Sequence, residues 1–408
     1  MWVLDTVFSL PVLVIALAIV GLIVARARAN IAAGGDIRTL AALPRAHGIN
    51  TALSVLVPAL ASYALLSLIR LIGRQQGTEV LSAGTVFWAV LAIAAIGCLG
   101  AILRSSAGFR ARLASEAWIR LVLIAASSVA ILTTLGIVLS MVFETLQFFR
   151  QYDWRDFFLS ADWAPNFRGN SALGILPLLW GTLYISFIAL VFAVPVGLFA
   201  AIYLSEYAGP RMRSVAKPLI EILAGIPTIV YGLFALITVG PVLRDYFAQP
   251  LGLGDSASSV MTAGLVMGIM LIPFVSSLSD DAINAVPQAM RDGSSALGAT
   301  RSETVRQVVI PAALPGIAGA VLLAASRAIG ETMIVVLGAG AAARLSLNPF
   351  EAMTTITVKI VSQLTGDTDF ASPETLVAFA LGLTLFTLTL GLNVLALKIV
   401  RKYREQYE

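Results

Sequence analysis

Two residues of opposite charge, Arg327 and Glu331, lie inside an apolar stretch of the chain. A charge at the centre of a bilayer costs about 2.5–3.5 kcal/mol on insertion scales, so such residues usually serve binding or transport. Their spacing of four positions places both on one helix face, close enough to pair. A guanidinium can bind an oxyanion through two parallel hydrogen bonds. We therefore predict that they line a path for an anion, with Glu331 neutralising Arg327 between passages. An ion pair that only fixes helix packing is the alternative.

Other residue types that enzymes and metal sites need are scarce. The single His and the single Cys, His47 and Cys98, exclude a disulfide framework, a Cys/His metal cluster and an HExxH zinc site. A P-loop ends in Gly-Lys-Ser/Thr, but no lysine of this chain is followed by Ser or Thr. We predict no metal, no cofactor and no ATP hydrolysis by this chain.

One enzyme class must be weighed, because Asp153 and Asp255 stand in Tyr-Asp and Gly-Leu-Gly-Asp sequences similar to those of intramembrane aspartyl proteases. That chemistry needs two aspartates inside the membrane that share a proton. Both aspartates here lie in polar segments outside the apolar runs. We therefore expect a chain that performs no covalent chemistry.

The composition identifies the solvent of most of the chain as lipid. Of 408 residues, 58% are hydrophobic and 12% are charged, and the mean hydropathy is +0.90. Soluble domains carry roughly 25% charged residues. The sequence predicts an all-α polytopic membrane protein with nine spans. These spans are Leu4–Val24, Leu53–Ile69, Leu81–Ile102, Ile119–Val142, Ile175–Leu204, Leu219–Val242, Val260–Ser279, Ala313–Val336 and Leu376–Val400.

The distribution of Lys and Arg predicts the orientation. With nine spans, 18 basic residues fall on one side of the membrane and 8 on the other. The side rich in Lys and Arg is normally cytoplasmic, which places the C-terminus inside and the N-terminus outside. The net charge of +4 calls for no nucleic-acid partner, since basic residues facing anionic lipid headgroups account for it.

The first three spans differ from the other six. We predict an N-terminal transmembrane module at residues 1–113 and a six-span core at residues 114–408. The outside segment Glu144–Gly174 interleaves Phe and Trp with Arg and Asp, which fits an interfacial helix, a docking surface for an extracytoplasmic partner, or both. In the core, Lys217 and Glu221 are spaced to form a local pair.

The inside loop at residues 280–311 is long but has the composition of an ordered segment. Its apolar residues recur with helical spacing around Gly298. This pattern predicts two short helices along the membrane face, joined at Gly298 and ended by Pro311 and Pro315. The glycine would allow a sharp bend between the two helices.

The same loop resembles a family motif. Its Arg291-Asp292-Gly293-Ser294, Gly298 and Val308-Val309-Ile310-Pro311 resemble the EAA loop of bacterial ABC importer permeases, although all three letters of EAA are replaced. Three further stretches resemble phosphate importer permeases of the PstC type. They are Gly174–Ser186, Lys217–Gly232 and Ser326–Met333.

The resemblance implies a type I ABC importer permease core of six helices with an N-terminal three-helix extension, in the cell inner membrane. It implies partners of four kinds: a PstA-like second permease, PstB-like ATPase subunits, a PstS-like periplasmic phosphate-binding protein and phosphate itself. Sulfate or molybdate is the alternative cargo. The implied contacts with the ATPase are made by Arg291, Asp292, Gly298, Thr300, Arg301 and Pro311.

Overall fold

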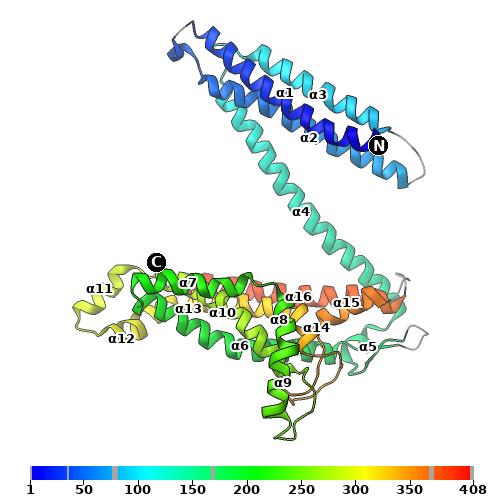
Figure 1. The fold of residues 1–408 in the computed structure, drawn as a ribbon, viewed down its shortest axis with the longest axis vertical. Coiled ribbons are helices and arrows are strands. Elements are labelled where there is room, and N and C mark those ends of the chain that lie inside the picture. The colour runs from blue at the N-terminus through cyan, green and yellow to red at the C-terminus, as the bar shows by residue number, and fades with distance from the viewer. Residues whose placement is uncertain (1, 35, 76–80, 167–170, 367–371, 405–408) are drawn as a thin grey trace. The chain divides into compact units, whose positions relative to one another are not determined.

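The computed structural model describes residues 2–34, 36–75, 81–166, 171–366 and 372–404 (Figure 1). Within these ranges nine helices are long and apolar enough to cross a membrane, which confirms the predicted number and order of spans. They are Leu10–Ala32, Pro44–Arg74, Ala83–Arg104, Ala111–Gln151, Leu176–Tyr207, Thr228–Ala248, Val260–Asn284, Arg301–Ile329 and Pro373–Lys402. Arg168, one of the basic residues counted on the outside, lies beyond the described residues.

The contacts divide the chain into two units, residues 1–136 and residues 137–408, and the division falls inside helix α4 (Ala111–Gln151). In the first unit α1 (Trp2–Ala32), α2 (Pro44–Gln75) and α3 (Ala83–Arg104) pack side by side (Figure 1). A short 3₁₀ turn, Ile37–Thr39, separates the first two of them. The bundle core consists mainly of Val and Ala side chains, which let the helix backbones approach closely.

The second unit is built around α10 (Val260–Asn284), the most buried of the spans, with 67% of its apolar window inside the protein. It packs most extensively against α6 (Leu176–Ile202). A Cβ on Gly264 would lie 2.6 Å from Ile188 Cγ2, and one on Gly268 would lie 3.0 Å from the Ala189 carbonyl oxygen. These two glycines therefore allow α6 and α10 to pack almost backbone to backbone.

The segment before α6 contains the short helix α5 (Trp154–Leu159) and a two-stranded ribbon, β1 (Trp163–Ala164) and β2 (Ala172–Leu173). The strands are antiparallel, with Trp163 opposite Leu173. Phe148 and Phe157 are fully buried, and their ring centroids are 5.5 Å apart. These two aromatic side chains belong to the protein core, whereas Trp154 remains 55% exposed.

The predicted sixth span, Leu219–Val242, is wrong in its bounds because the helix breaks at Ile226 and Pro227. The break separates α7 (Pro210–Gly225) from α8 (Thr228–Phe234). Proline lacks an N–H and disfavours helical geometry in the residue before it, and Ile226 is extended, with ψ 128°. The helical chain then continues to the end of the span through three further segments, Ala235–Val239, Gly240–Leu243 and Arg244–Ala248.

The predicted eighth span, Ala313–Val336, is also wrong in its bounds. Its helix begins at Arg301 and runs through α12 (Arg301–Thr304), a π segment (Val305–Val309) and α13 (Ile310–Ile329). Pro311 and Pro315 do not end the loop, because the wide π turn lies just before Pro311, where a regular α-helix would meet the ring. After α13 come α14 (Met333–Gly338), α15 (Ile356–Gly366) and α16 (Pro373–Arg404).

Close approach of α2 and α3 leads to a stability prediction. A Cβ on Gly97 would lie 2.2 Å from the Ser54 carbonyl oxygen, whereas one on Gly100 would have nothing within 4 Å. We expect Gly97→Ala to destabilise the first unit by about 1–3 kcal/mol, because backbone cannot yield as a flexible side chain does. Thermal unfolding of the purified protein in detergent should show a lower midpoint for this variant.

Gly100→Ala is the matched control on the same helix. Replacing an exposed helical glycine by alanine is expected to leave the midpoint unchanged or raise it slightly. Equal midpoints for the two variants would contradict the packing described here.

Candidate functional site

The segment after α10 forms a sharp corner. Helix α11 (Gln288–Ala296) follows Pro287, and a turn with Gly298 at φ +84° leads into α12. A positive φ suits glycine and strains other residues, so the predicted bend at Gly298 is confirmed. The predicted second short helix is instead the beginning of the long helix Arg301–Ile329.

Local hydrogen bonds fix the corner. Thr300 and Glu303 form a capping box: Thr300 Oγ1 accepts from the Glu303 amide at 3.4 Å, and Glu303 Oε2 accepts from the Thr300 amide at 2.8 Å. Across the turn the Ser294 and Thr304 hydroxyls are 2.9 Å apart and hydrogen-bonded. Leu297, at the tip, is 91% exposed. The corner therefore exposes an apolar side chain on a turn that is held by hydrogen bonds.

The six residues predicted to contact an ATPase fall into two groups. Arg291 packs against the rest of the second unit, and its side chain is 17% exposed. The other five residues are exposed. Asp292 accepts a hydrogen bond from Gln288 at 3.0 Å. The Arg301 guanidinium lies over the Tyr207 ring, 5.4 Å from its centroid. The remaining three are Gly298, Thr300 and Pro311.

Arg291 connects the corner to two other elements. It forms an ion pair with Glu206, which is 8% exposed and lies in the π turn Tyr203–Tyr207 at the end of α6. Its Nη2 also donates to the Ile283 carbonyl oxygen at 2.7 Å. Sequence reasoning missed Glu206, for which the one available signal is an acidic residue close after an apolar span.

The structure separates the predicted pair of Arg327 and Glu331. Helix α13 ends at Ile329, so the two residues do not share a helix face, and none of the ion pairs in the described part of the chain joins them. Glu331 instead lies two residues before α14, where its carboxylate accepts a hydrogen bond from the Met333 amide at 3.2 Å. The signal for this break was Gly330, a helix-stopping residue inside an apolar run.

Arg327 lies in the last turn of α13 and is exposed on the surface of this chain. Its Nη2 is 3.9 Å from the sulfur of Met270, which is near the middle of α10. The Glu331 carbonyl oxygen accepts a hydrogen bond of 2.8 Å from Thr357, beside the start of α15. The break therefore brings an exposed cation, a carboxylate and an α15 hydroxyl into one region of the second unit.

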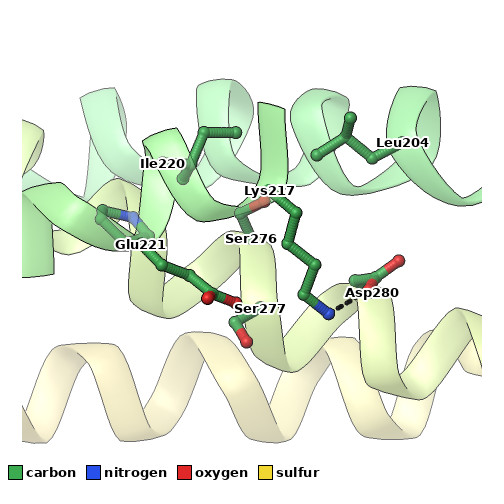
Figure 2. Close-up of a pocket in the computed structure, with 8 residues that line it drawn as sticks. Leu204, Lys217, Ile220, Glu221, Ser276, Ser277 and Asp280 are labelled. Carbon is green, nitrogen blue, oxygen red and sulfur yellow. Dashed lines mark hydrogen bonds and ion pairs between the residues drawn. The ribbon is translucent and has the colours of Figure 1, made fainter. Parts of the chain in front are cut away.

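The spacing of Lys217 and Glu221 predicted a local ion pair, and this prediction is wrong. Lys217 reaches across to Asp280 on α10, with Nζ 2.8 Å from Oδ2 (Figure 2). The hydrogen bond from Asp280 raises the pKa of the Lys217 ammonium, which therefore stays charged. Both side chains line a small pocket between α7 and α10, together with Ser276 and Ser277.

The two aspartates of the protease alternative lie outside the nine spans. Asp153 caps α5 by accepting from the Arg155 amide at 2.8 Å, and Asp255 lies in the polar turn before α10. A shared proton between facing membrane aspartates cannot arise from this arrangement.

The chain is similar to known proteins over most of the second unit. The sequence profile described as "Binding-protein-dependent transport system inner membrane component" matches residues 193–405, just over half of the chain. A second profile, described as "Phosphate ATP-binding cassette transporter", matches residues 12–76.

Two curated relatives and one solved structure illustrate the likeness. The phosphate transport system permease protein PstC 1 of Mycobacterium tuberculosis is 36% identical and covers 60% of this chain and 81% of its own length. The probable ABC transporter permease protein YqgH of Bacillus subtilis is 32% identical and covers 57% of this chain and 74% of its own length. One chain in a crystal structure of a bacterial alginate ABC transporter aligns with a TM-score of 0.49 at 17% identity. The alignment covers 72% of this chain and 98% of that one.

The turn at Gly298 leads to a second prediction. In Gly298→Val a β-branched residue would have to adopt φ +84°, at a cost of about 1–2 kcal/mol per residue. We expect amides of the α11–α12 corner to exchange hydrogen roughly 5- to 30-fold faster, because local opening becomes easier by that amount. Hydrogen exchange of the purified protein followed by mass spectrometry measures this.

Gly293→Ala is the control, since this residue lies within α11 and a Cβ there meets nothing within 4 Å. Its exchange should be unchanged or slower. Equal acceleration in both variants would show that the Gly298 conformation does not determine the corner.

Proposed function

Since this chain belongs to the binding-protein-dependent transport system inner membrane components, we propose that it is the permease subunit of an ATP-driven phosphate importer. It is a transport subunit and not an enzyme, and a separate chain hydrolyses ATP. The protease alternative is therefore discarded. The phosphate assignment draws on the relatives named as phosphate transport system permeases, of which this chain covers more than two thirds.

The hydrogen-bonded corner between α11 and α12 is the basis of our proposal for how this chain is coupled to the ATPase. Its tip is the exposed Leu297, and its outer surface includes Asp292, Thr300 and Arg301. An exposed apolar side chain with a polar rim fits a groove on a partner protein. This corner is the proposed contact with PstB-like ATPase subunits, because it is the part of the cytoplasmic loop that the core does not cover.

The remaining proposed partners complete the importer. A PstA-like permease covers the exposed face of this subunit, and a PstS-like periplasmic protein delivers phosphate to the outside. The segment around α5 and the β-ribbon supports this docking, since Trp154 stays exposed while its aromatic neighbours hold α5 in place.

The proposed translocation path passes Arg327 and Glu331. A lipid-facing arginine is costly, by up to about 2.5–3.5 kcal/mol at the bilayer centre, so the exposed face of Arg327 is better placed toward water or a second permease. Because Glu331 accepts from the Met333 amide and forms none of the ion pairs in the described part of the chain with Arg327, the guanidinium can offer its hydrogen bonds to an incoming oxyanion. Glu331 was first expected to neutralise Arg327 between passages of the anion. We now propose that it stabilises the helix break before α14.

The proposal includes a membrane orientation and an N-terminal module, both supported by the sequence. The excess of basic residues supports a periplasmic N-terminus and a cytoplasmic C-terminus in the inner membrane. Residues 1–113 form the proposed N-terminal extension, and residues 114–408 the six-helix core of the type I importer. The profile match at residues 12–76 supports a place for this extension in phosphate transporters.

Sulfate and molybdate are the alternative cargoes, since an arginine would attract any of these oxyanions. Uptake of labelled phosphate by cells that depend on this chain, with labelled sulfate as the control anion, tests the proposal. Phosphate uptake that is unchanged when the gene is deleted, or sulfate uptake that falls in its place, would refute it.

We predict that Arg327→Gln lowers phosphate uptake roughly tenfold or more, because a charge-assisted hydrogen bond contributes about 1.5–3 kcal/mol. Arg327→Lys should retain part of the activity, since it keeps the charge but loses the bidentate geometry. The measurement is initial uptake rate in membranes with equal amounts of assembled complex.

Arg120→Gln is the matched control, because this arginine is also exposed on a helix but lies in the first unit. It should transport at the native rate. Native transport by Arg327→Gln, with the complex intact, would remove Arg327 from the path.

A further inference from the structure

Two buried carboxylates lie at the inner ends of adjoining helices. Glu206 is 8% exposed and follows α6, and Asp280 is 3% exposed near the end of α10. A carboxylate withdrawn from water must be paired, and removing one partner leaves an uncompensated charge. Each of these residues therefore fixes the helices that carry its partners.

We call the segment from α11 through the Gly298 turn to α12 the coupling corner, and Arg291 joins it to Glu206. The Arg291 guanidinium pairs with Glu206 and donates to the Ile283 carbonyl oxygen at 2.7 Å, so one side chain of α11 touches the ends of both α6 and α10. A displacement of α11 must move these helix ends or break the bonds.

Asp280 continues the connection from α10 to α7. Its oxygens accept from Arg213 Nη2 at 3.0 and 2.9 Å, from Lys217 Nζ at 2.8 Å and from Asn284 Nδ2 at 2.9 Å. Figure 2 shows Lys217 extending from α7 toward this carboxylate. Two cations one helical turn apart on α7 thus bind a single carboxylate, which restrains sliding of α7 along α10.

Helix α7 is in turn connected to the region of Glu331. Across the break at Pro227 the Tyr231 hydroxyl of α8 donates to the Leu223 carbonyl oxygen of α7 at 2.8 Å. A Cβ on Gly232 would lie 2.9 Å from Leu337 Cδ1, so α8 packs tightly on α14. Helix α14 begins two residues after Glu331.

We propose that Glu206 and Asp280 are positioning residues that transmit movement of the coupling corner through α7 and α8 to the helix break beside Arg327. This inference rests on the proposed function, because it assigns a mechanical role within the importer. Neither carboxylate needs to touch phosphate or the ATPase. Their role is to make α11, α6, α10 and α7 move together.

The test uses the complete importer in proteoliposomes, with ATPase subunits, second permease and phosphate-binding protein. The quantity measured is phosphate transported per ATP hydrolysed. Glu206→Ala and Asp280→Asn should lower this ratio roughly tenfold, within the range by which single substitutions change coupling between sites. ATP hydrolysis should continue, since the nucleotide sites lie in another chain.

Glu116→Gln serves as the control, because it removes an ion pair that is 3.0 Å long but exposed on both sides, with Arg112. Its ratio should equal that of the unmodified importer. The exchange of charges between Glu206 and Arg291 gives a readout that a merely structural role would not produce. Glu206→Arg and Arg291→Glu should each uncouple the importer, and together they should recover a ratio at least about threefold above either alone.

Recovery in the double variant is expected to be partial, since the bond to the Ile283 carbonyl is lost. If Asp280→Asn does not assemble, the charge exchange decides, and a double variant no better than the single ones overturns the inference. Unchanged ratios in assembled Glu206→Ala and Asp280→Asn complexes also overturn it. An unmodified complex without ATP-dependent phosphate uptake refutes the proposed function instead.

Discussion

The absence of water from the bilayer interior is the constraint on which this structure depends. Backbone groups there must find partners within the protein, which favours unbroken helices. Two core helices nevertheless break, and specific side chains satisfy the groups near each break. Tyr231 donates to the Leu223 carbonyl at the first break. At the second, Thr357 donates to the Glu331 carbonyl, and the Glu331 carboxylate accepts from the Met333 amide.

The same constraint governs the charges. At the ends of α6 and α10 that adjoin α11, the buried carboxylates of Glu206 and Asp280 are neutralised by arginine and lysine of this chain. Arg327 differs, because its closest described polar contact is a methionine sulfur and its side chain is exposed. A charge compensated within the chain serves architecture, whereas a charge left exposed at the end of α13, beside a helix break, is compatible with the proposed path shared with a second subunit.

The coupling corner combines local and distant interactions. Its bend depends on Gly298 and on the capping box of Thr300, both within a few residues of one another. Its attachment depends on Arg291, whose partner Glu206 is 85 positions away in the sequence. The corner is therefore held together by local bonds and joined to the spans by a distant one, which suits the proposed connection between a motor subunit and a gate.

The sequence by itself determined the number and order of the nine spans, the bend at Gly298 and the family, because hydropathy, glycine geometry and motif spacing are local properties. Only the tertiary structure decided which of the prolines and glycines inside the apolar runs break a helix, here Pro227 and Gly330, and how the charges pair. Lys217 was expected to pair with Glu221 four positions on but binds Asp280, 63 positions away. Spacing along one helix shows which side chains can meet, but a neighbouring helix offers partners that only packing places within reach.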